Sequence, residues 1–350
     1  MGHIFIQYVR PVYSDVKRAK AGRGFPLSAP DSYIVRRAQR LIYPPLSALN
    51  TSADYVELLQ RIQMSPLKKI SIAGTEWVCD EGTGVETLHV KDPHALIKAA
   101  GYLKFTHAGI QKSEAIYFRG ERKLYESLSP TLFRGIHQSK TKERKTIAVQ
   151  DIIKSFQEKC RIFNSFGQYS HEPLLQHYGI STSWVDVVDN IWVALWFACH
   201  QAKSSGEGGH YLHFEKRIPA SSSDYAYILL IGADIEKRNG QKPGYYFGKN
   251  TELVDLRMAA PSVFLRPHSQ HGLLFRCKGA DNERPNDYSR QIRGIVRVSL
   301  KDALAWLGEG KIVGTHSLFP PPFYDDGYRI LLESGVSIDK SIGSISMVGA

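Results

Sequence analysis

The chain has 350 residues, 43% of them hydrophobic and 23% charged, which is close to globular averages and excludes disorder over most of its length. It holds no run of about 18 apolar residues and no secretory signal pattern, so we expect a cytoplasmic protein without membrane contact. Its formal charge of +11 favours a polyanionic partner, because Lys and Arg displace counterions from phosphates. A basic face that merely keeps the protein in solution is the alternative.

The length favours two units over one. We expect a basic N-terminal extension at residues 1–110, a main domain at residues 111–340 and a flexible tail at residues 341–350. Residues 1–50 hold eight Lys or Arg and two Asp, so more than half of the net charge lies there. The four cysteines are scattered without metal-ligand spacing, which predicts reduced, buried thiols and neither disulfides nor a metal site.

Within the N-terminal extension, apolar spacing predicts a helix over residues 54–64 and a strand or hairpin over residues 70–78. Asp92 and Pro93 are typical of a helix start, and this helix is expected to run to Leu103.

The pattern changes in the main domain, where residues 115–118 predict a strand that ends at Arg119 and Gly120. After a basic loop over residues 140–145, apolar positions at helical spacing predict an amphipathic helix over residues 147–166.

A short helix over residues 172–178 is expected to end at Gly179, and Asp189 is expected to cap a buried helix over residues 191–202. Further elements follow: strands over residues 225–231, 272–277 and 295–299, helices over residues 300–307 and 327–334, and a loosely ordered end from residue 342. Helices mixed with dispersed strands favour the α+β class.

Three sequence blocks carry a resemblance to a known family. The first is Tyr-Phe-Arg-Gly-Glu at residues 117–121, and the second is Leu-Gln-His-Tyr-Gly-Ile-Ser-Thr-Ser-Trp-Val-Asp at residues 175–186. The third is Ser-Gln-His-Gly-Leu-Leu-Phe at residues 269–275. In these motifs and their order, residues 114–335 resemble the FRG domain. Ser-Thr-Ser at residues 181–183 stands where the family commonly has Pro-Thr-Arg, so no role for that arginine carries over.

The order of the motifs also resembles that of the ADP-ribosyltransferase superfamily. That resemblance implies split mixed or antiparallel sheets with flanking helices, beside a small N-terminal α/β extension, and NAD as a substrate. It implies catalytic roles for Arg119, Thr182, Ser183 and Gln270. The residues expected to bind NAD are Arg119, Gly120, His177, Tyr178, Ser181, Trp184 and Asp186.

Each residue type suits its implied role. The guanidinium of Arg119 can bind a pyrophosphate, and Gly120 lets a ligand approach the backbone. Gln270 can accept a hydrogen bond from a ribose hydroxyl but cannot act as a base. Either another residue is the base, the acceptor needs none, or the pocket binds NAD without fast chemistry. The candidate bases are His177, Asp186 and His271.

Purely structural roles are the alternative. The only function of Arg119 could be an ion pair with Asp186 that connects two core segments, and residues 181–183 could form an ordinary turn. The leading hypothesis is a NAD-dependent ADP-ribosyltransferase that modifies nucleic acid, with RNA favoured over DNA, while a protein acceptor such as a translation factor stays open. It fits a bacterial toxin or anti-phage defence effector, with an antitoxin or immunity protein as a further partner. The alternatives are a non-catalytic FRG recognition module and a metal-independent nuclease that uses Arg119, His177 and Asp186.

Overall fold

The computed structural model describes residues 71–110, 114–238, 241–279, 285–310 and 313–349. The chain divides into two units, Met1–Leu49 and Asn50–Ala350, and all described residues belong to the second. The helix predicted over residues 54–64 lies outside the described residues.

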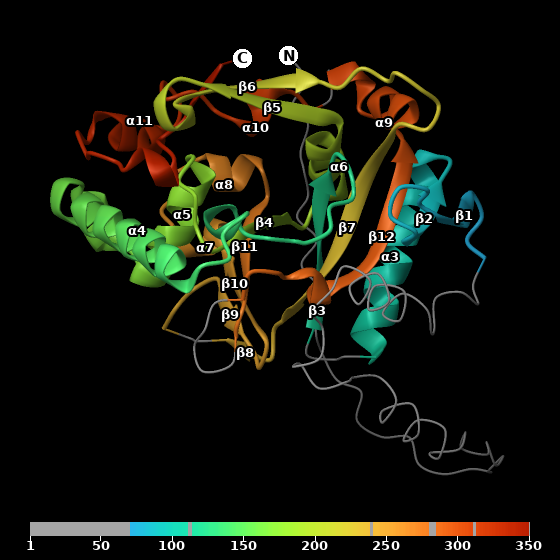
Figure 1. Ribbon diagram of the computed structural model, residues 1–350, viewed down its shortest axis with the longest axis horizontal. Helices are drawn as coiled ribbons and strands as arrows, with labels where there is room; N and C mark the ends of the chain where they lie inside the picture. The colour runs from blue at the N-terminus through green and yellow to red at the C-terminus, as the bar shows by residue number, and fades with distance from the viewer. Residues whose placement is uncertain (1–70, 111–113, 239–240, 280–284, 311–312, 350) are drawn as a thin grey trace, which may run out of the picture. The chain divides into compact units, whose positions relative to one another are not determined.

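A ten-stranded mixed sheet runs through the second unit (Figure 1). In spatial order its strands are β1 (Thr75–Cys79), β2 (Glu86–Val90), β12 (Ile292–Ser299), β7 (Tyr225–Asp234), β3 (Glu114–Glu121), β4 (Val185–Val188), β11 (Gly272–Cys277), β10 (Thr251–Asp255), β9 (Tyr245–Phe247) and β8 (Lys237–Arg238). Neighbouring strands are antiparallel except for β2 and β12, which are parallel. The predicted α+β class is confirmed.

The sheet narrows between β3 and β4. Strand β3 pairs with β7 from Glu114 to Glu121, whereas it pairs with β4 only through Phe118 and Val188. Two groups of five strands therefore meet at a single residue pair.

A second sheet has three strands, in the order β13 (Met347–Gly349), β6 (Tyr211–Lys216) and β5 (His200–Ser205). Strand β13 runs parallel to β6, with Met347 opposite Tyr211. The end of the chain, predicted to be loosely ordered from residue 342, thus contains a strand whose backbone groups are paired.

The segment before β3 is built into the main sheet. Helix α3 (Pro93–Ile110) begins where predicted, and the Asp92 carboxylate accepts a hydrogen bond from the Ala95 amide at 2.8 Å. Strand β2 hydrogen-bonds to β12, and Leu88 and Leu96 are buried in the core. Residues 75–110 therefore extend the sheet and its core, in contrast to the boundary expected at residue 110.

Helix α4 (Ser139–Lys159) begins well before residue 147 and ends before Cys160. The stretch over residues 140–145, predicted to be a loop, is therefore helical. Lys, Glu and Arg are good helix formers, and this turn has no apolar periodicity because much of it faces solvent. The end of the predicted helix instead forms a 3₁₀ turn, Arg161–Ser165.

Helix α5 (His171–His177) is followed by Gly179 with φ +113°, in line with the predicted stop. Helix α6 (Ile191–Cys199) is capped by Asn190, whose side-chain oxygen accepts from the Trp192 amide at 2.9 Å. The predicted cap, Asp189, pairs with other side chains, and the helix gives way to β5 at His200 instead of running to residue 202.

The other helices are α7 (Leu256–Ala259), α8 (Arg266–Ser269), α9 (Leu300–Trp306), α10 (Thr315–Leu318) and α11 (Asp326–Glu333). Strands β7, β11 and β12 and helices α9 and α11 confirm the elements predicted in the second half of the chain. Among the helices that the structure describes, none has the length and apolar character needed to cross a bilayer.

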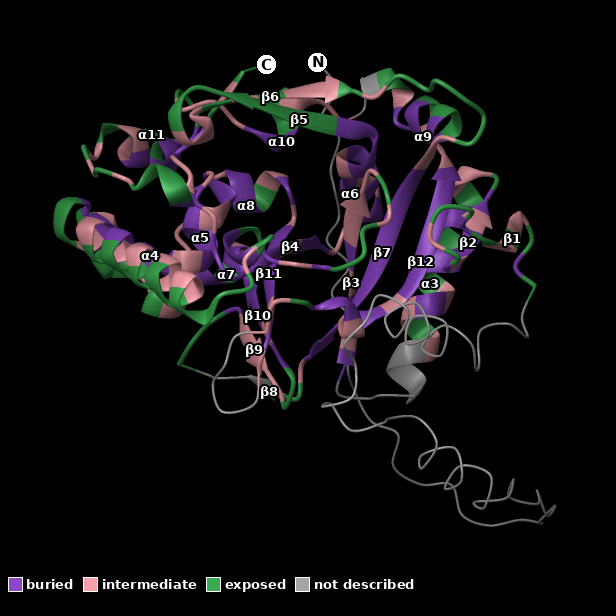
Figure 2. Cartoon of the chain, in the orientation of Figure 1, coloured by how far each residue is buried: buried purple, intermediate pink, exposed green. Residues whose placement is uncertain are grey.

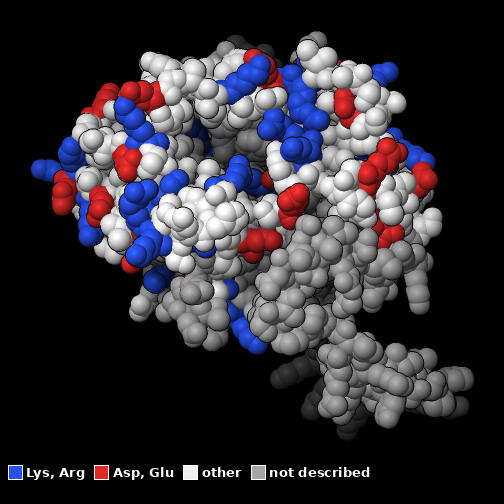
Figure 3. Space-filling model, in the orientation of Figure 1, with Lys and Arg blue, Asp and Glu red and all other residues white. Residues whose placement is uncertain are grey.

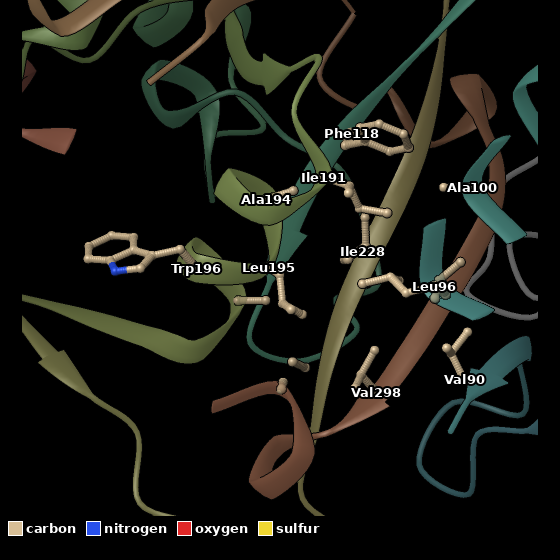
Figure 4. Packing of buried hydrophobic residues seen from close by; sticks show 14 of the residues in the cluster. Val90, Leu96, Ala100, Phe118, Ile191, Ala194, Leu195, Trp196, Ile228 and Val298 are labelled. Atoms are coloured by element: carbon tan, nitrogen blue, oxygen red, sulfur yellow. The ribbon is translucent and has the colours of Figure 1, made fainter. Parts of the chain in front are cut away.

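The central strands are buried along most of their length (Figure 2). Apolar side chains of α6, such as Leu195, pack with Phe118 of β3 and Ile228 of β7 in one cluster, part of which is seen in Figure 4. This packing fixes the ends of β3 and β4, where the predicted site residues lie.

Candidate functional site

The Arg119 side chain lies at the point where β3 and β4 part. Its Nη1 donates to the backbone oxygen of Asp186 at 2.8 Å, and its Nε donates to Glu121 Oε1 at 2.6 Å. Burial disfavours the charged guanidinium, but the nearby carboxylates of Glu121 and Asp186 outweigh burial and raise the pKa of Arg119. The side chain as a whole is 21% exposed, while its charged group is desolvated by the surrounding protein.

Gly120 has a packing role. Side chains alternate along a strand, and Phe118, two residues earlier, packs with α6. A Cβ at Gly120 would lie 1.8 Å from the backbone oxygen of Ala194 in α6. Glycine thus lets α6 rest directly on β3, and the alternation places Arg119 on the opposite face of the strand.

Gln176, at the end of α5, links two predicted site residues. Its Nε2 donates to Asp186 Oδ2 at 2.7 Å, and its Oε1 accepts a hydrogen bond from the Thr182 hydroxyl. Thr182 is fully buried, and its hydroxyl oxygen also accepts from the Trp184 amide at 3.1 Å. Sequence reasoning gave Gln176 no role, although it lies within the 175–186 block.

Ser183 is also fully buried. Its hydroxyl and its amide both donate to Glu172 Oε1, at 2.8 and 3.1 Å, and its carbonyl accepts from the Tyr288 hydroxyl at 2.7 Å. The neighbouring Trp184 ring is covered by the guanidinium of Arg276, 4.2 Å from the ring centroid. The hydroxyls of Thr182 and Ser183 therefore both bond protein groups.

Gln270 and His177 form a separate buried pair. Gln270 Oε1 lies 3.1 Å from His177 Nδ1, and Gln270 Nε2 donates to the Leu318 carbonyl at 2.9 Å. Burial lowers the pKa of His177, so the ring is neutral near pH 7, and the Gln270 oxygen assigns its proton to Nδ1. The other ring nitrogen faces the backbone at Gly272, where a Cβ would lie 2.6 Å away.

Tyr178 belongs to the core. It is fully buried, and its hydroxyl donates to Asp325 Oδ2 at 2.8 Å. The guanidinium of Arg266, another residue without a role in the sequence interpretation, lies 4.7 Å from the Tyr178 ring centroid. Ser181 is only half-buried, and its amide donates to the Ile342 carbonyl at 2.7 Å.

Residues 114–207 match the FRG domain. We call this stretch the FRG segment. It contains Arg119, Gln176, Thr182 and Asp186, so the hydrogen-bonded network at the β3–β4 junction lies wholly within it. The third block of the predicted resemblance, with Gln270, lies outside the match. No curated protein and no solved structure matches the chain.

The predicted residues of the FRG segment are brought together only in part. Arg119, Asp186 and Thr182 are connected through the Asp186 backbone and Gln176. Within the described ranges, no hydrogen bond or ion pair joins Arg119 to Gln270. Tyr178 and Trp184, expected to bind NAD, are in contact with Arg266 and Arg276.

The partly exposed polar groups of the FRG segment at this junction are few. They are Arg119, Glu121, Glu172, Gln176, Ser181 and Asp186. Gln176 holds Asp186 Oδ2, and no described residue donates to Asp186 Oδ1. The Arg119 guanidinium can bind an anion. The Asp186 carboxylate, with one unengaged oxygen, can accept a proton.

His271, a third candidate base, lies outside the FRG segment but contacts Asp189, which belongs to it. Its Nδ1 lies 3.0 Å from Asp189 Oδ1, and Arg257 Nη2 lies 2.8 Å from Asp189 Oδ2. His271 has φ +53°, a conformation that non-glycine residues seldom adopt. Its side chain is 43% exposed, so it is more accessible than His177.

Two shallow hollows border the small sheet. One, of about 380 Å³, is lined by Tyr211, His213 and Met347, and the other, of about 310 Å³, by Glu207 and Lys340. No predicted site residue lines either hollow. In the part of the chain that the structure describes, no group of three His, Cys, Asp or Glu side chains is placed to hold a metal ion.

Proposed function

We propose that the FRG segment and the strands beside it form a NAD-dependent ADP-ribosyltransferase that modifies nucleic acid, with RNA as the favoured acceptor. One observation carries the proposal. Motifs at Arg119, Asp186 and Gly272, far apart in sequence, lie on the neighbouring strands β3, β4 and β11, at the narrowest point of the sheet.

Transfer breaks the bond between the nicotinamide nitrogen and C1′ of the adjacent ribose, and the bonding electrons leave with neutral nicotinamide. A new bond forms from C1′ to a nucleophilic atom of the acceptor, whose proton passes to a base. The protein must therefore hold a pyrophosphate, tolerate positive charge at C1′ and accept a proton.

Arg119 binds the pyrophosphate in this proposal. Its Nε and Nη1 are fixed by Glu121 and the Asp186 carbonyl, and no described residue accepts from its Nη2. A guanidinium held in this way loses little side-chain entropy when it binds phosphate.

Asp186 is the favoured base among the three candidates. Its Oδ2 is held by Gln176 while Oδ1 has no donor in the described ranges, and the residue is half-buried. His177, by contrast, is buried and its Nδ1 proton is engaged by Gln270. Gln176 is a positioning residue, because it orients both Asp186 and Thr182.

A non-catalytic recognition module is the second candidate. It is favoured by the polar atoms of Thr182, Ser183 and Gln270, which bond protein groups. In that case the site binds a nucleotide without turnover.

Incubation of the full chain with NAD labelled on the adenylate phosphate, in separate pools of RNA, DNA and protein, tests the proposal. We expect label on RNA with the wild type and with Arg329→Gln, whose residue forms an exposed ion pair with Asp326. Arg119→Gln should raise KM for NAD, and Asp186→Asn should lower kcat with little change in KM.

Circular dichroism of each variant separates lost chemistry from lost folding. Equal labelling by wild type, Arg119→Gln and Asp186→Asn would overturn the assigned site. Absence of label from every pool, with NAD bound in calorimetry, would favour the recognition module.

A further inference from the structure

Three exposed cations lie on the first turns of α4 and on the turn before it, which contacts α4: Lys140, Arg144 and Arg134. We call them the α4 cation patch. In the described ranges no carboxylate lies within ion-pair distance of any of the three, whereas Lys91, Lys203 and Lys216 each pair with a glutamate. Figure 3 shows Lys and Arg atoms over α4, with Asp and Glu atoms among them.

The helix geometry keeps the patch in solvent. Lys140 and Arg144 are four residues apart, so they share one face and lie ~6 Å apart along the axis. The inner face of α4 packs Val149, Ile152 and Phe156 into the core. Like charges at this spacing repel each other by a few tenths of a kcal/mol, and a bound anion would relieve that repulsion.

The patch is tied to the candidate site through the chain between them. In the 3₁₀ turn Thr131–Phe133, just before the patch, the Leu132 amide donates to the Thr182 carbonyl at 3.2 Å. Helix α4 also packs against α5, which carries Gln176. Helix α4 therefore has a fixed position relative to Asp186.

We propose that the α4 cation patch binds the phosphodiester backbone of the acceptor, a single-stranded RNA, beside the site. The identity of the acceptor rests on the proposed function. None of the three has to leave an ion-pair partner to bind a phosphate, although Asp339 lies within electrostatic range of Arg144. Lys91, Lys203 and Lys216 must first leave their glutamates. Between Arg134 and Lys145 the chain has five Lys or Arg and one Glu, so this stretch is a strong local source of positive potential.

The test measures binding of a fluorescein-labelled single-stranded oligoribonucleotide to the full chain by anisotropy, without NAD, over a range of salt. The triple variant Arg134→Gln/Lys140→Gln/Arg144→Gln removes the patch. The matched control, Lys91→Gln/Lys203→Gln/Lys216→Gln, removes the same net charge from paired positions.

We expect the patch variant to bind RNA at least tenfold more weakly at low salt. The slope of log K against log salt should fall by about 2, because each lost phosphate contact on a single strand removes about 0.7. The control should keep the wild-type slope. Equal losses in both variants, a weaker affinity with unchanged slope, or no RNA binding by the wild type would each overturn the proposal.

Binding is measured without NAD, so the result does not depend on transferase activity. If the labelling experiment fails while the patch variant loses RNA affinity, the proposed chemistry falls and the RNA surface stands. Duplex DNA of the same sequence is a second arm: stronger binding to it than to RNA, lost equally in the patch variant, would overturn RNA as the acceptor.

Discussion

Arg119 Nη1 donates to the backbone oxygen of Asp186 at 2.8 Å, across the point where β3 and β4 separate. The strands share a single residue pair, Phe118 with Val188. Because the pairing of β3 with β4 does not extend beyond these two residues, the Arg119 side chain donates the hydrogen bond to the Asp186 carbonyl. The same guanidinium that is proposed to bind phosphate thus also joins the two halves of the sheet.

We predict that Arg119→Met lowers the free energy of unfolding by ~1–2 kcal/mol. The substitution keeps much of the side-chain length but leaves the Asp186 carbonyl and Glu121 without their donor, and partial exposure lets water replace some of the loss. Urea unfolding followed by circular dichroism measures the change. Arg329→Met, at an exposed ion pair, should stay within ~0.5 kcal/mol; a similar loss in both variants would contradict the structural role of Arg119.

Two glycines should respond to alanine in opposite directions. Gly120→Ala would place its Cβ 1.8 Å from the Ala194 backbone oxygen, so α6 must shift, and we expect a loss of ~3 kcal/mol or more. Gly101 lies in α3, where an added Cβ would meet no atom within 4 Å, and Gly101→Ala should stabilise by up to ~1 kcal/mol through helix propensity. Thermal unfolding of both variants checks the pair, and a stable Gly120→Ala protein would show that α6 does not need this close approach.

The sequence predicted elements whose signal is local. The apolar run before Arg119, the Pro93 helix start and the Gly179 stop each depend on neighbouring residues, and all three are present. The first turns of α4 were missed, because an exposed helix start rich in Lys and Arg has no apolar period. Strand β13 was also missed, because its partner β6 lies far away in the sequence.

The candidate site was predicted to a smaller extent. The order of the motifs placed Arg119 and Asp186 in one region, and the structure joins them through a backbone carbonyl. The roles of Gln176 and Glu172 were not foreseen, because a side chain that links a helix to a following turn leaves no periodic signal. Burial of Thr182 depends in the same way on tertiary packing.

His171 is expected to make stability depend on pH. The ring is fully buried and lies edge-on to Phe163 and Phe166, with centroids 5.0 and 4.8 Å away. Burial lowers its pKa below the ordinary 6.5, so below that pH the unfolded chain binds a proton that the folded chain does not. The contribution of His171 to the free energy of unfolding is therefore fully present above pH 6.5. It decreases as the pH drops below that value, by at most ~1.4 kcal/mol per pH unit for one group.

Urea unfolding at a series of pH values below neutrality measures that slope. His171→Phe should flatten it, while His268→Gln, at an exposed position, should leave it unchanged. His177 and His200 are also buried with lowered pKa values, so some slope should remain in the His171 variant. An identical slope in wild type and His171→Phe would contradict this prediction, because it would mean that the ring takes up its proton at the same pH in the folded and the unfolded chain.

The four cysteines should differ in reactivity. Cys79, at the end of β1, is exposed, in contrast to the buried thiol that the sequence predicted, while the other three are buried. Burial raises the pKa of Cys160 and Cys277, and that of Cys199 to about 12, so their thiolates are scarce near neutrality. A disulfide reagent such as DTNB should therefore titrate Cys79 rapidly in the folded chain and all four thiols in denaturant. Cys79→Ser should abolish the fast phase and Cys199→Ser should preserve it; a fast phase that survives Cys79→Ser would mean that a second thiol reaches the surface.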